Sequence, residues 1–147
     1  MFRGNYTTRM DEKGRLKVPA GFKRLLDENY SSAKFFITSL DGAAAQIYPM
    51  EEWEKLEAEV KARDKNNPHR NKWIRNTSYY GQEVEMDGQG RLLIPALLRE
   101  KATLSGDVDV LGTPEFLKVV NHEVLRKQVE EDPFTDEDAQ ALSESGS

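Results

Sequence analysis

The period of the hydrophobic pattern changes several times along the chain, and each change predicts an element. In residues 15–19, RLKVP, apolar and charged side chains alternate, as they do in a strand with one buried face. The proline ends that strand because it cannot donate to a strand ladder. Residues 20–28 then predict a short helix with three apolar side chains on one face: Phe22, Leu25 and Leu26.

Beyond this helix the sequence predicts a pair of strands and a second helix. Segments rich in apolar residues at 34–39 and 45–48 are typical of strands. The helix that follows continues to about residue 64, because Trp53, Leu56 and Val60 form a helical stripe among Glu and Lys residues.

The same pattern then recurs. Residues 87–100, DGQGRLLIPALLRE, align without a gap on residues 11–24, DEKGRLKVPAGFKR. The second copy predicts a helix at 96–103 and strands at 107–111 and 116–120, before a closing helix. We therefore interpret the chain as a tandem pair of one unit, since a solenoid would need three or more copies.

The two units are placed at residues 5–52 and 81–124, and two segments fall outside them. The first is a basic linker at 65–80, whose polar start, KNNPHRN, favours a break before a helix at 73–80. The second is the acidic tail at 130–147. The tail lacks the apolar density to fold alone, so we expect it to be disordered or loosely docked.

Composition adds limits on the class of protein. Charged residues make up 32% of the chain and hydrophobic residues 37%, which predicts a soluble protein with a thin core. No stretch resembles a signal peptide or approaches about 18 consecutive apolar residues, so we expect a cytoplasmic protein with no membrane partner. The chain has no cysteine, which excludes a disulfide framework and a thiolate metal site.

The net charge of −5 is unevenly distributed along the chain. Residues 128–147 hold seven acidic side chains and no basic one, so the first 127 residues carry a net charge of +2. Residues 1–24 hold seven Lys or Arg side chains against two acidic ones, and residues 63–75 hold five against one. Basic patches beside an acidic tail are compatible with polyanion binding and equally with a solvated surface.

The repeated Asp-x-x-Gly-Arg loop has two compatible explanations. The members of the first loop are Asp11, Gly14 and Arg15, and those of the second are Asp87, Gly90 and Arg91. As a hairpin turn, the Asp accepts backbone N–H groups, the Gly allows a positive φ, and an exposed Asp–Arg pair contributes ~0–1 kcal/mol. As a binding loop, the Asp orders the turn and holds the guanidinium towards phosphates or guanine edges.

More positive charge surrounds the first loop than a turn requires. It comes from Arg3, Arg9, Lys13, Arg15 and Lys17. At the second loop, three of these positions carry Glu85, Gln89 and Leu93 instead. If both loops bind a polyanion, we expect the first to contribute more of the affinity.

These motifs together resemble the MraZ family. The resemblance rests on the opening MFRG, the two loop motifs, IYPMEEWEKLE and the NP-x-R segment at 67–70, and it covers roughly residues 1–125. Members of that family are transcriptional regulators of the bacterial division and cell-wall gene cluster. The resemblance implies an α+β fold in which two SpoVT-AbrB-type units form a swapped-hairpin, double-psi-like β-barrel with flanking helices.

The resemblance also implies a function and a site. It implies that the chain is nucleoid-associated and binds repeated promoter sequences in double-stranded DNA as a ring-like homo-oligomer. The implied DNA contacts are Arg15 and Arg91, held by Asp11 and Asp87, with Lys13 beside them. We add the neighbouring cations Arg3, Arg9 and Lys17 as candidate DNA contacts, and Gly14 and Gly90 as loop-ordering residues.

Oligomerisation also has a physical argument of its own. Each neutralised phosphate steepens the dependence of log K on log[salt] by only ~0.9, so a few cations on one chain bind a duplex weakly at physiological salt. Several subunits presenting equivalent loops to a repeated DNA sequence would gain by effective concentration.

The sequence also bears on two other functions, an enzyme and a protein-interaction module. The only histidines, His69 and His122, are not in a metal-ligand spacing, and no nucleotide-binding or hydrolase motif is present. We therefore expect no enzyme activity, no catalytic or metal site and no cofactor. The alternative is an antitoxin-like protein-interaction module of the same barrel type, in which the acidic tail binds a protein partner. The tail could also screen the DNA surface or simply be solvated.

Overall fold

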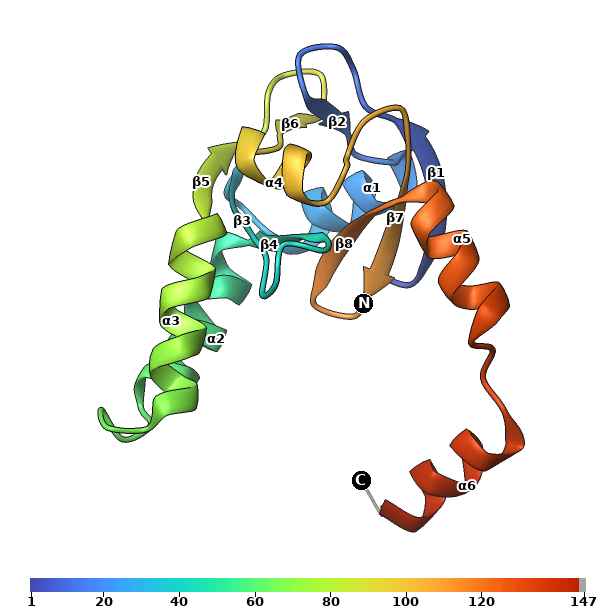
Figure 1. The fold of residues 1–147 in the computed structure, drawn as a ribbon. Coiled ribbons are helices and arrows are strands. Elements are labelled where there is room, and N and C mark those ends of the chain that lie inside the picture. The colour runs from blue at the N-terminus through green and yellow to red at the C-terminus, as the bar shows by residue number, and fades with distance from the viewer. Residues whose placement is uncertain (146–147) are drawn as a thin grey trace.

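A computed structural model describes residues 1–145 of the chain, and both of its halves repeat one order of elements (Figure 1). In the first half these are β1 (Gly4–Arg9), β2 (Arg15–Lys17), α1 (Ala20–Asn29), β3 (Lys34–Thr38), β4 (Ala45–Pro49) and α2 (Met50–Lys61). In the second they are β5 (Gln82–Glu85), β6 (Arg91–Leu93), α4 (Ala96–Lys101), β7 (Asp107–Thr113), β8 (Phe116–Asn121) and α5 (His122–Glu131). The strands and helices predicted from the period of the sequence are present, most with ends displaced by up to two residues, but α2 ends at Lys61 rather than near residue 64.

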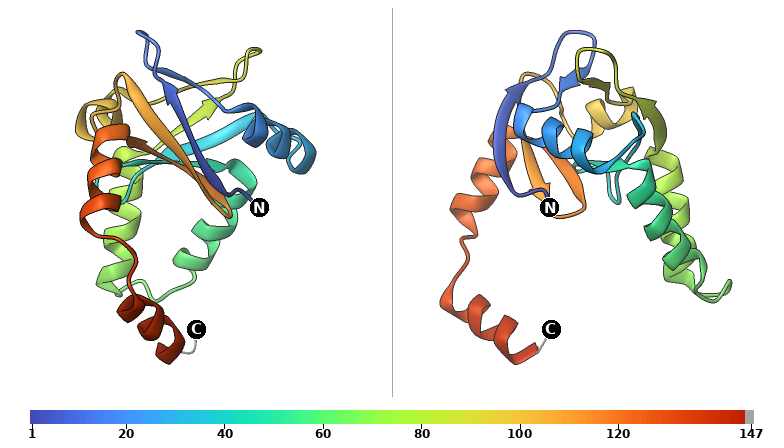
Figure 2. Two further views of the ribbon diagram at one scale, coloured as in Figure 1. Left: turned by 90° about the vertical axis from the view of Figure 1, so that its right-hand side faces the viewer. Right: turned by 180° about the vertical axis from the view of Figure 1, so that it is seen from behind.

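The strands of the two halves are interleaved, which gives an α+β fold with a mostly antiparallel sheet (Figure 2). The larger sheet has the order β1-β7-β8-β4-β3-β5, and β2 pairs with β6 in a small second sheet. The first strand of each half therefore pairs with a strand of the other half, β1 with β7 and β5 with β3. Because of this exchange, neither half has a complete sheet of its own.

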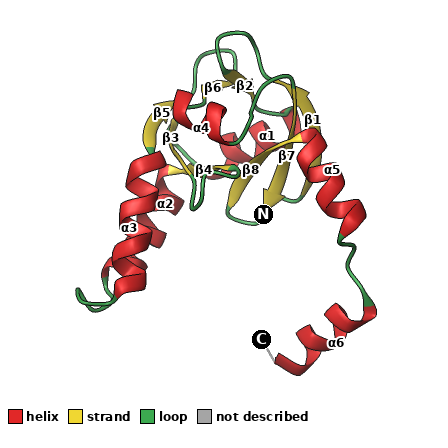
Figure 3. Cartoon of the chain, viewed as in Figure 1, coloured by secondary structure: helices red, strands yellow, loops and turns green. Residues whose placement is uncertain are grey.

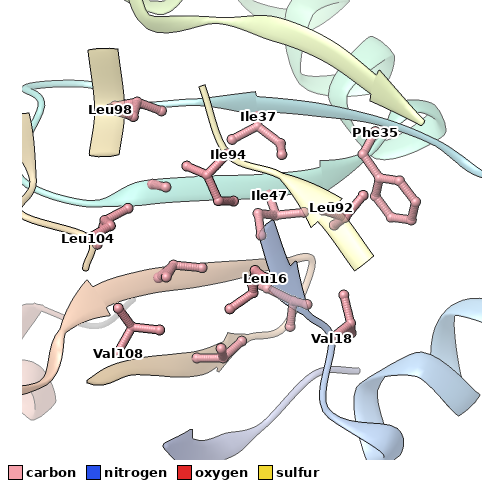
Figure 4. Packing of buried hydrophobic residues seen from close by; sticks show 14 of the residues in the cluster. Leu16, Val18, Phe35, Ile37, Ile47, Leu92, Ile94, Leu98, Leu104 and Val108 are labelled. Atoms are coloured by element: carbon pink, nitrogen blue, oxygen red, sulfur yellow. The ribbon is translucent and has the colours of Figure 1, made fainter. Parts of the chain in front are cut away.

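One apolar core serves both halves. Leu16 of β2 lies opposite Leu92 of β6, and both side chains are fully buried (Figure 4). Residues of the larger sheet, such as Ile37, Ile47 and Val108, pack in the same cluster. Complete burial of an aliphatic side chain of this size contributes about 2 kcal/mol, so β2 and β6 are fixed in place although each is only three residues long.

The connection between the halves is more helical than the sequence pattern predicted. Helix α3 (Pro68–Tyr80) begins inside the segment 65–71 that we expected to be a break. The side chain of Asn67 caps the helix by accepting from two backbone N–H groups, and Pro68 occupies its first turn, where a missing N–H costs nothing. The break is therefore confined to the residues before Pro68.

Helices α2 and α3 form a hairpin that projects from the sheet and is fixed by an aromatic stack. The Trp53 ring stacks on Phe36 of β3 at 4.5 Å and on Trp73 of α3 at 5.1 Å between ring centroids. Offset stacks of this kind add about 1 kcal/mol each beyond the area they bury. The stack therefore holds α3 against α2 and α2 against the sheet.

The acidic tail corrects one expectation. The sequence predicted a tail that is disordered or loosely docked, and the structure shows a helix, α6, at Asp136–Ser145 in place of disorder; residues 146–147 of the predicted tail lie outside the described part of the chain. A reciprocal cap explains the helix, since the Thr135 N–H donates to Asp138 Oδ2 and the Asp138 N–H donates to Thr135 Oγ1. Figure 3 shows α6 set apart from the sheet. No helix in residues 1–145 is long and apolar enough to cross a membrane.

Candidate nucleic-acid interface

The first Asp-x-x-Gly-Arg loop is organised around one carboxylate. Asp11 Oδ1 accepts the backbone N–H groups of Lys13 at 2.9 Å and Arg15 at 2.8 Å, and Asp11 Oδ2 accepts Arg15 Nε at 2.7 Å. Gly14 has a φ of +83°, a conformation that favours glycine. The predicted Asp–Arg pair therefore forms, and it also orders the turn.

The second loop repeats this geometry. Asp87 Oδ1 accepts the N–H groups of Gln89 at 2.8 Å and Arg91 at 3.0 Å, and Asp87 Oδ2 accepts Arg91 Nε at 2.9 Å. Gly90 has a φ of +76°. The same chemistry at the same spacing has thus produced the same local structure twice.

Each aspartate is stabilised in its charged form. The hydrogen bond from the Arg15 N–H lowers the pKa of Asp11, and the Arg15 side chain and the Lys13 N–H act in the same direction against the effect of burial. The pKa of Asp87 is lowered in the same way, first by the Arg91 N–H. Both carboxylates are therefore ionised at neutral pH and hold their arginines as ion pairs.

The arginines keep their terminal nitrogens available. In both ion pairs the aspartate binds Nε, and neither arginine's Nη1 or Nη2 has a hydrogen bond to another residue in the described part of the chain. The side chains of Arg15 and Arg91 are 29% and 26% exposed. A guanidinium anchored at Nε can still present its two terminal nitrogens to a phosphate or a guanine edge.

The fold brings the two loops to one end of the molecule. The Ile94 N–H donates to the Gly14 carbonyl, and the Val18 N–H donates to the Gly90 carbonyl, each at 3.0 Å. Each loop is therefore bonded to the residue just beyond the strand that follows the other loop. Figure 1 shows both loops at the same end of the molecule, above the small β2–β6 sheet, and Figure 2 shows their tips pointing apart.

Three of the other predicted cations lie near the first loop. Lys13 is exposed in the turn itself, and Lys17 is exposed on β2 opposite Arg91 in the strand register. Arg9 ends β1 just before the loop and makes an exposed ion pair with Asp107 at 3.4 Å. The second loop has no cation of its own at the matching positions, which are Glu85, Gln89 and Leu93, although Lys17 lies across the strand pair from Arg91.

Arg3 is not part of this group. It precedes Gly4 at the start of β1, the end where Gly4 lies opposite Gly112, whereas the loop follows the other end of that strand. The strand is six residues long, which separates its ends by roughly 20 Å. The charge count of residues 1–24 had grouped Arg3 with the loop, and the extended strand between them explains why the two are apart.

Two cations that the sequence analysis missed contact the loops from helices. Arg99 of α4 packs against Gly14, and Lys23 of α1 lies near Gly90. These two residues occupy matching positions in the aligned segments 11–24 and 87–100, each the second-to-last residue of its segment. The repeat alignment therefore contained the signal.

Comparison with known proteins identifies the family of the chain. The family model described as "MraZ protein, putative antitoxin-like" matches residues 1–76 and 81–144, which include both loops. The transcriptional regulator MraZ of Acidobacterium capsulatum is 54% identical over 146 residues, and that of Koribacter versatilis 51%, each alignment covering 99% of both chains. The corresponding protein of Syntrophobacter fumaroxidans is 37% identical over 126 residues, covering 86% of this chain and 79% of its own. The chain therefore belongs to the MraZ family.

Proposed function

We propose that this protein is a transcriptional regulator that binds double-stranded DNA through its two Asp-x-x-Gly-Arg loops. The observation that carries the proposal is the pair of adjacent loops, each holding an arginine by Nε with its terminal nitrogens available. The relatives are named as transcriptional regulators, not as enzymes, which supports the role. The proposed target is the promoter region of the bacterial division and cell-wall gene cluster, and the proposed location is the nucleoid.

The two loops contribute unequally in this proposal. The first loop carries Lys13 in its turn and follows Arg9, whereas the second carries Gln89 and follows Glu85; Lys17 lies two residues from Arg15 and across the strand pair from Arg91, so it is close to both loops. Phosphate contacts supply most of the affinity of a DNA-binding protein and base contacts supply specificity. The first loop is therefore expected to supply the larger share of the affinity.

We also propose that several subunits act together on repeated DNA sequences as a ring-like assembly. The few cations of one chain support only weak binding at physiological salt, and adjacent subunits raise the effective concentration of each loop. Exposed apolar side chains on α3, α5 and the tail, Tyr79, Val129 and Phe134, supply surface for subunit contacts. The interleaved strands are compatible with a swapped-hairpin barrel, which forms part of this proposal.

A gel-shift titration with DNA from upstream of the protein's own operon tests the proposal. Arg15→Ala and Arg91→Ala should each weaken specific binding, and Arg15→Ala should do so more. Arg3→Ala is the matched control, because it removes an exposed arginine at the far end of β1. If both loop variants bound DNA as well as wild type, the two arginines would have only a structural role. The basic linker would then be the next candidate for the DNA contact.

A second candidate function is an antitoxin-like interaction module. The matching family model is described as "putative antitoxin-like", and α5 leaves Val124 and Val129 exposed beside the acidic tail. In this case the segment after Val129 would bind a protein partner. Truncation after Val129 should leave the ratio of specific to non-specific DNA binding unchanged if the tail is only solvated, and should lower that ratio if the tail screens the loops.

A further inference from the structure

A guanidinium from the second half of the chain covers the first loop. The Arg99 side chain extends from α4 over Gly14, which is buried, and a Cβ added to Gly14 would overlap the carbon and two nitrogens of that guanidinium. Arg99 is therefore in direct contact with the loop backbone at the residue before Arg15.

Hydrogen bonds tie this guanidinium to the same backbone. Arg99 Nε donates to the Ile94 carbonyl at 2.9 Å, and the Ile94 N–H donates to the Gly14 carbonyl at 3.0 Å. The Arg99 carbonyl accepts the Leu104 N–H at 2.9 Å, which fixes the end of α4. Gly14, Ile94 and Arg99 thus form a closed group in which each member restrains the next.

The corresponding contact at the second loop is weaker. A Cβ added to Gly90 would lie 3.4 Å from Lys23 Cε, an ordinary contact with a flexible chain. Lys23 Nζ is bound to both oxygens of Asp27 on its own helix, at 2.7 and 2.9 Å. The repeat position that matches Asp27 is Thr103, which has no carboxylate to draw Arg99 away.

We infer that Arg99 is a positioning residue for the first loop, and that this loop is a composite of both halves of the chain. Arg99 holds the backbone of Gly14 and so the direction in which Arg15 leaves the loop. An arginine suits this role because its planar group can lie on a glycine backbone while Nε donates, which a lysine ammonium cannot do. The second loop has no equivalent support, so it should be the more mobile of the two.

Amide hydrogen exchange tests the inference without DNA. Arg99→Met should speed exchange of the Ile94 N–H, whose acceptor is Gly14, by about tenfold, and leave the Val18 N–H, whose acceptor is Gly90, unchanged. Lys101→Met, which removes an exposed charge from the same helix, should change neither. Arg99→Lys should behave like Arg99→Met and keeps the charge, so it remains informative if the methionine variant folds poorly. Equal exchange at Ile94 in wild type and Arg99→Lys would overturn the inference.

A double-mutant cycle tests the consequence for DNA binding, which rests on the proposed function. Arg99→Met combined with Arg15→Ala should weaken binding by about tenfold less than the product of the two single effects. When Arg99→Met is combined with Arg91→Ala, the loss of DNA affinity should equal the product of the two single losses. Full products in both cycles would show that Arg99 does not act through Arg15. If wild-type protein bound no DNA, the proposed function would fail while the exchange result would still decide the role of Arg99.

Discussion

Asp11 and Asp87 each organise one loop by accepting two backbone N–H groups and one arginine Nε. The sequence predicted both loops and left open whether the Asp–Arg pair was structural or functional. The geometry makes the two roles compatible, because the aspartate uses the nitrogen of the guanidinium that lies nearest the chain. An ion pair through both terminal nitrogens would have turned the outer edge of the guanidinium towards the aspartate and away from a DNA partner.

The two loop glycines should differ in their tolerance of a side chain. Both have positive φ, so either Gly→Ala change should lower the free energy of unfolding by about 1–2 kcal/mol. Gly14→Ala must also displace the Arg99 guanidinium, whereas Gly90→Ala meets only Lys23 at 3.4 Å. Urea denaturation should therefore rank Gly14→Ala as the more destabilising. Equal losses would mean that the Arg99 contact contributes nothing to stability.

The lowered pKa values of the two aspartates predict a pH dependence. A carboxyl whose pKa is lower in the folded protein stabilises the fold above its unfolded value of 3.8, and this stabilisation is lost as the pH falls through the folded value. Urea denaturation between pH 3 and 7 should show wild type losing more stability below about pH 4 than the Asp11→Asn, Asp87→Asn double variant. Parallel curves for the two proteins would contradict this origin of the acid sensitivity.

At the scale of elements, the sequence predicted what the local spacing of apolar residues determines. The strand β2 and the helix α1 follow from alternating and helical spacing, and their observed bounds agree with the prediction to within two residues. The start of α3 and the whole of α6 were missed because both depend on caps, at Asn67 and Thr135, rather than on apolar spacing. A search for Asx and Thr caps in polar segments would have found them.

The aromatic stack between α2 and α3 gives an element-scale prediction. Trp73→Ala removes the ring stacked on Trp53 at 5.1 Å, so it should lower the free energy of unfolding by about 2 kcal/mol and shift the fluorescence of Trp53. DNA affinity of the folded variant should be unchanged, because the hairpin lies away from the loops. Loss of DNA binding with normal stability would instead place Trp73 at the nucleic-acid interface.

At the scale of the whole molecule, the interleaving of strands could not be predicted from local pattern. Pairing of β1 with β7 and of β5 with β3 joins residues about 50 to 100 positions apart, and apolar alternation does not identify the partner. The same interleaving brings Arg99 of the second half onto the first loop, a contact that depends on which segments the complete sheet brings together.

Interleaving also predicts that the halves cannot fold separately. A fragment of residues 1–80 keeps β1 and β3 but loses their partners β7 and β5, and β2 loses β6. It should therefore be unfolded as a monomer or self-associate to replace the missing strands. Circular dichroism and sedimentation of this fragment check the prediction, which a monomer with cooperative thermal unfolding would contradict.

The salt dependence of DNA binding tests the central claim most directly. Fluorescence anisotropy over a range of salt concentrations should give wild-type and Arg3→Ala proteins the same slope of log K against log[salt]. Arg15→Ala and Arg91→Ala should each reduce that slope by about 1 if the arginine contacts a phosphate, and Arg15→Ala should lose more affinity. If both variants kept the affinity and slope of wild type, the loops would not be the DNA contact.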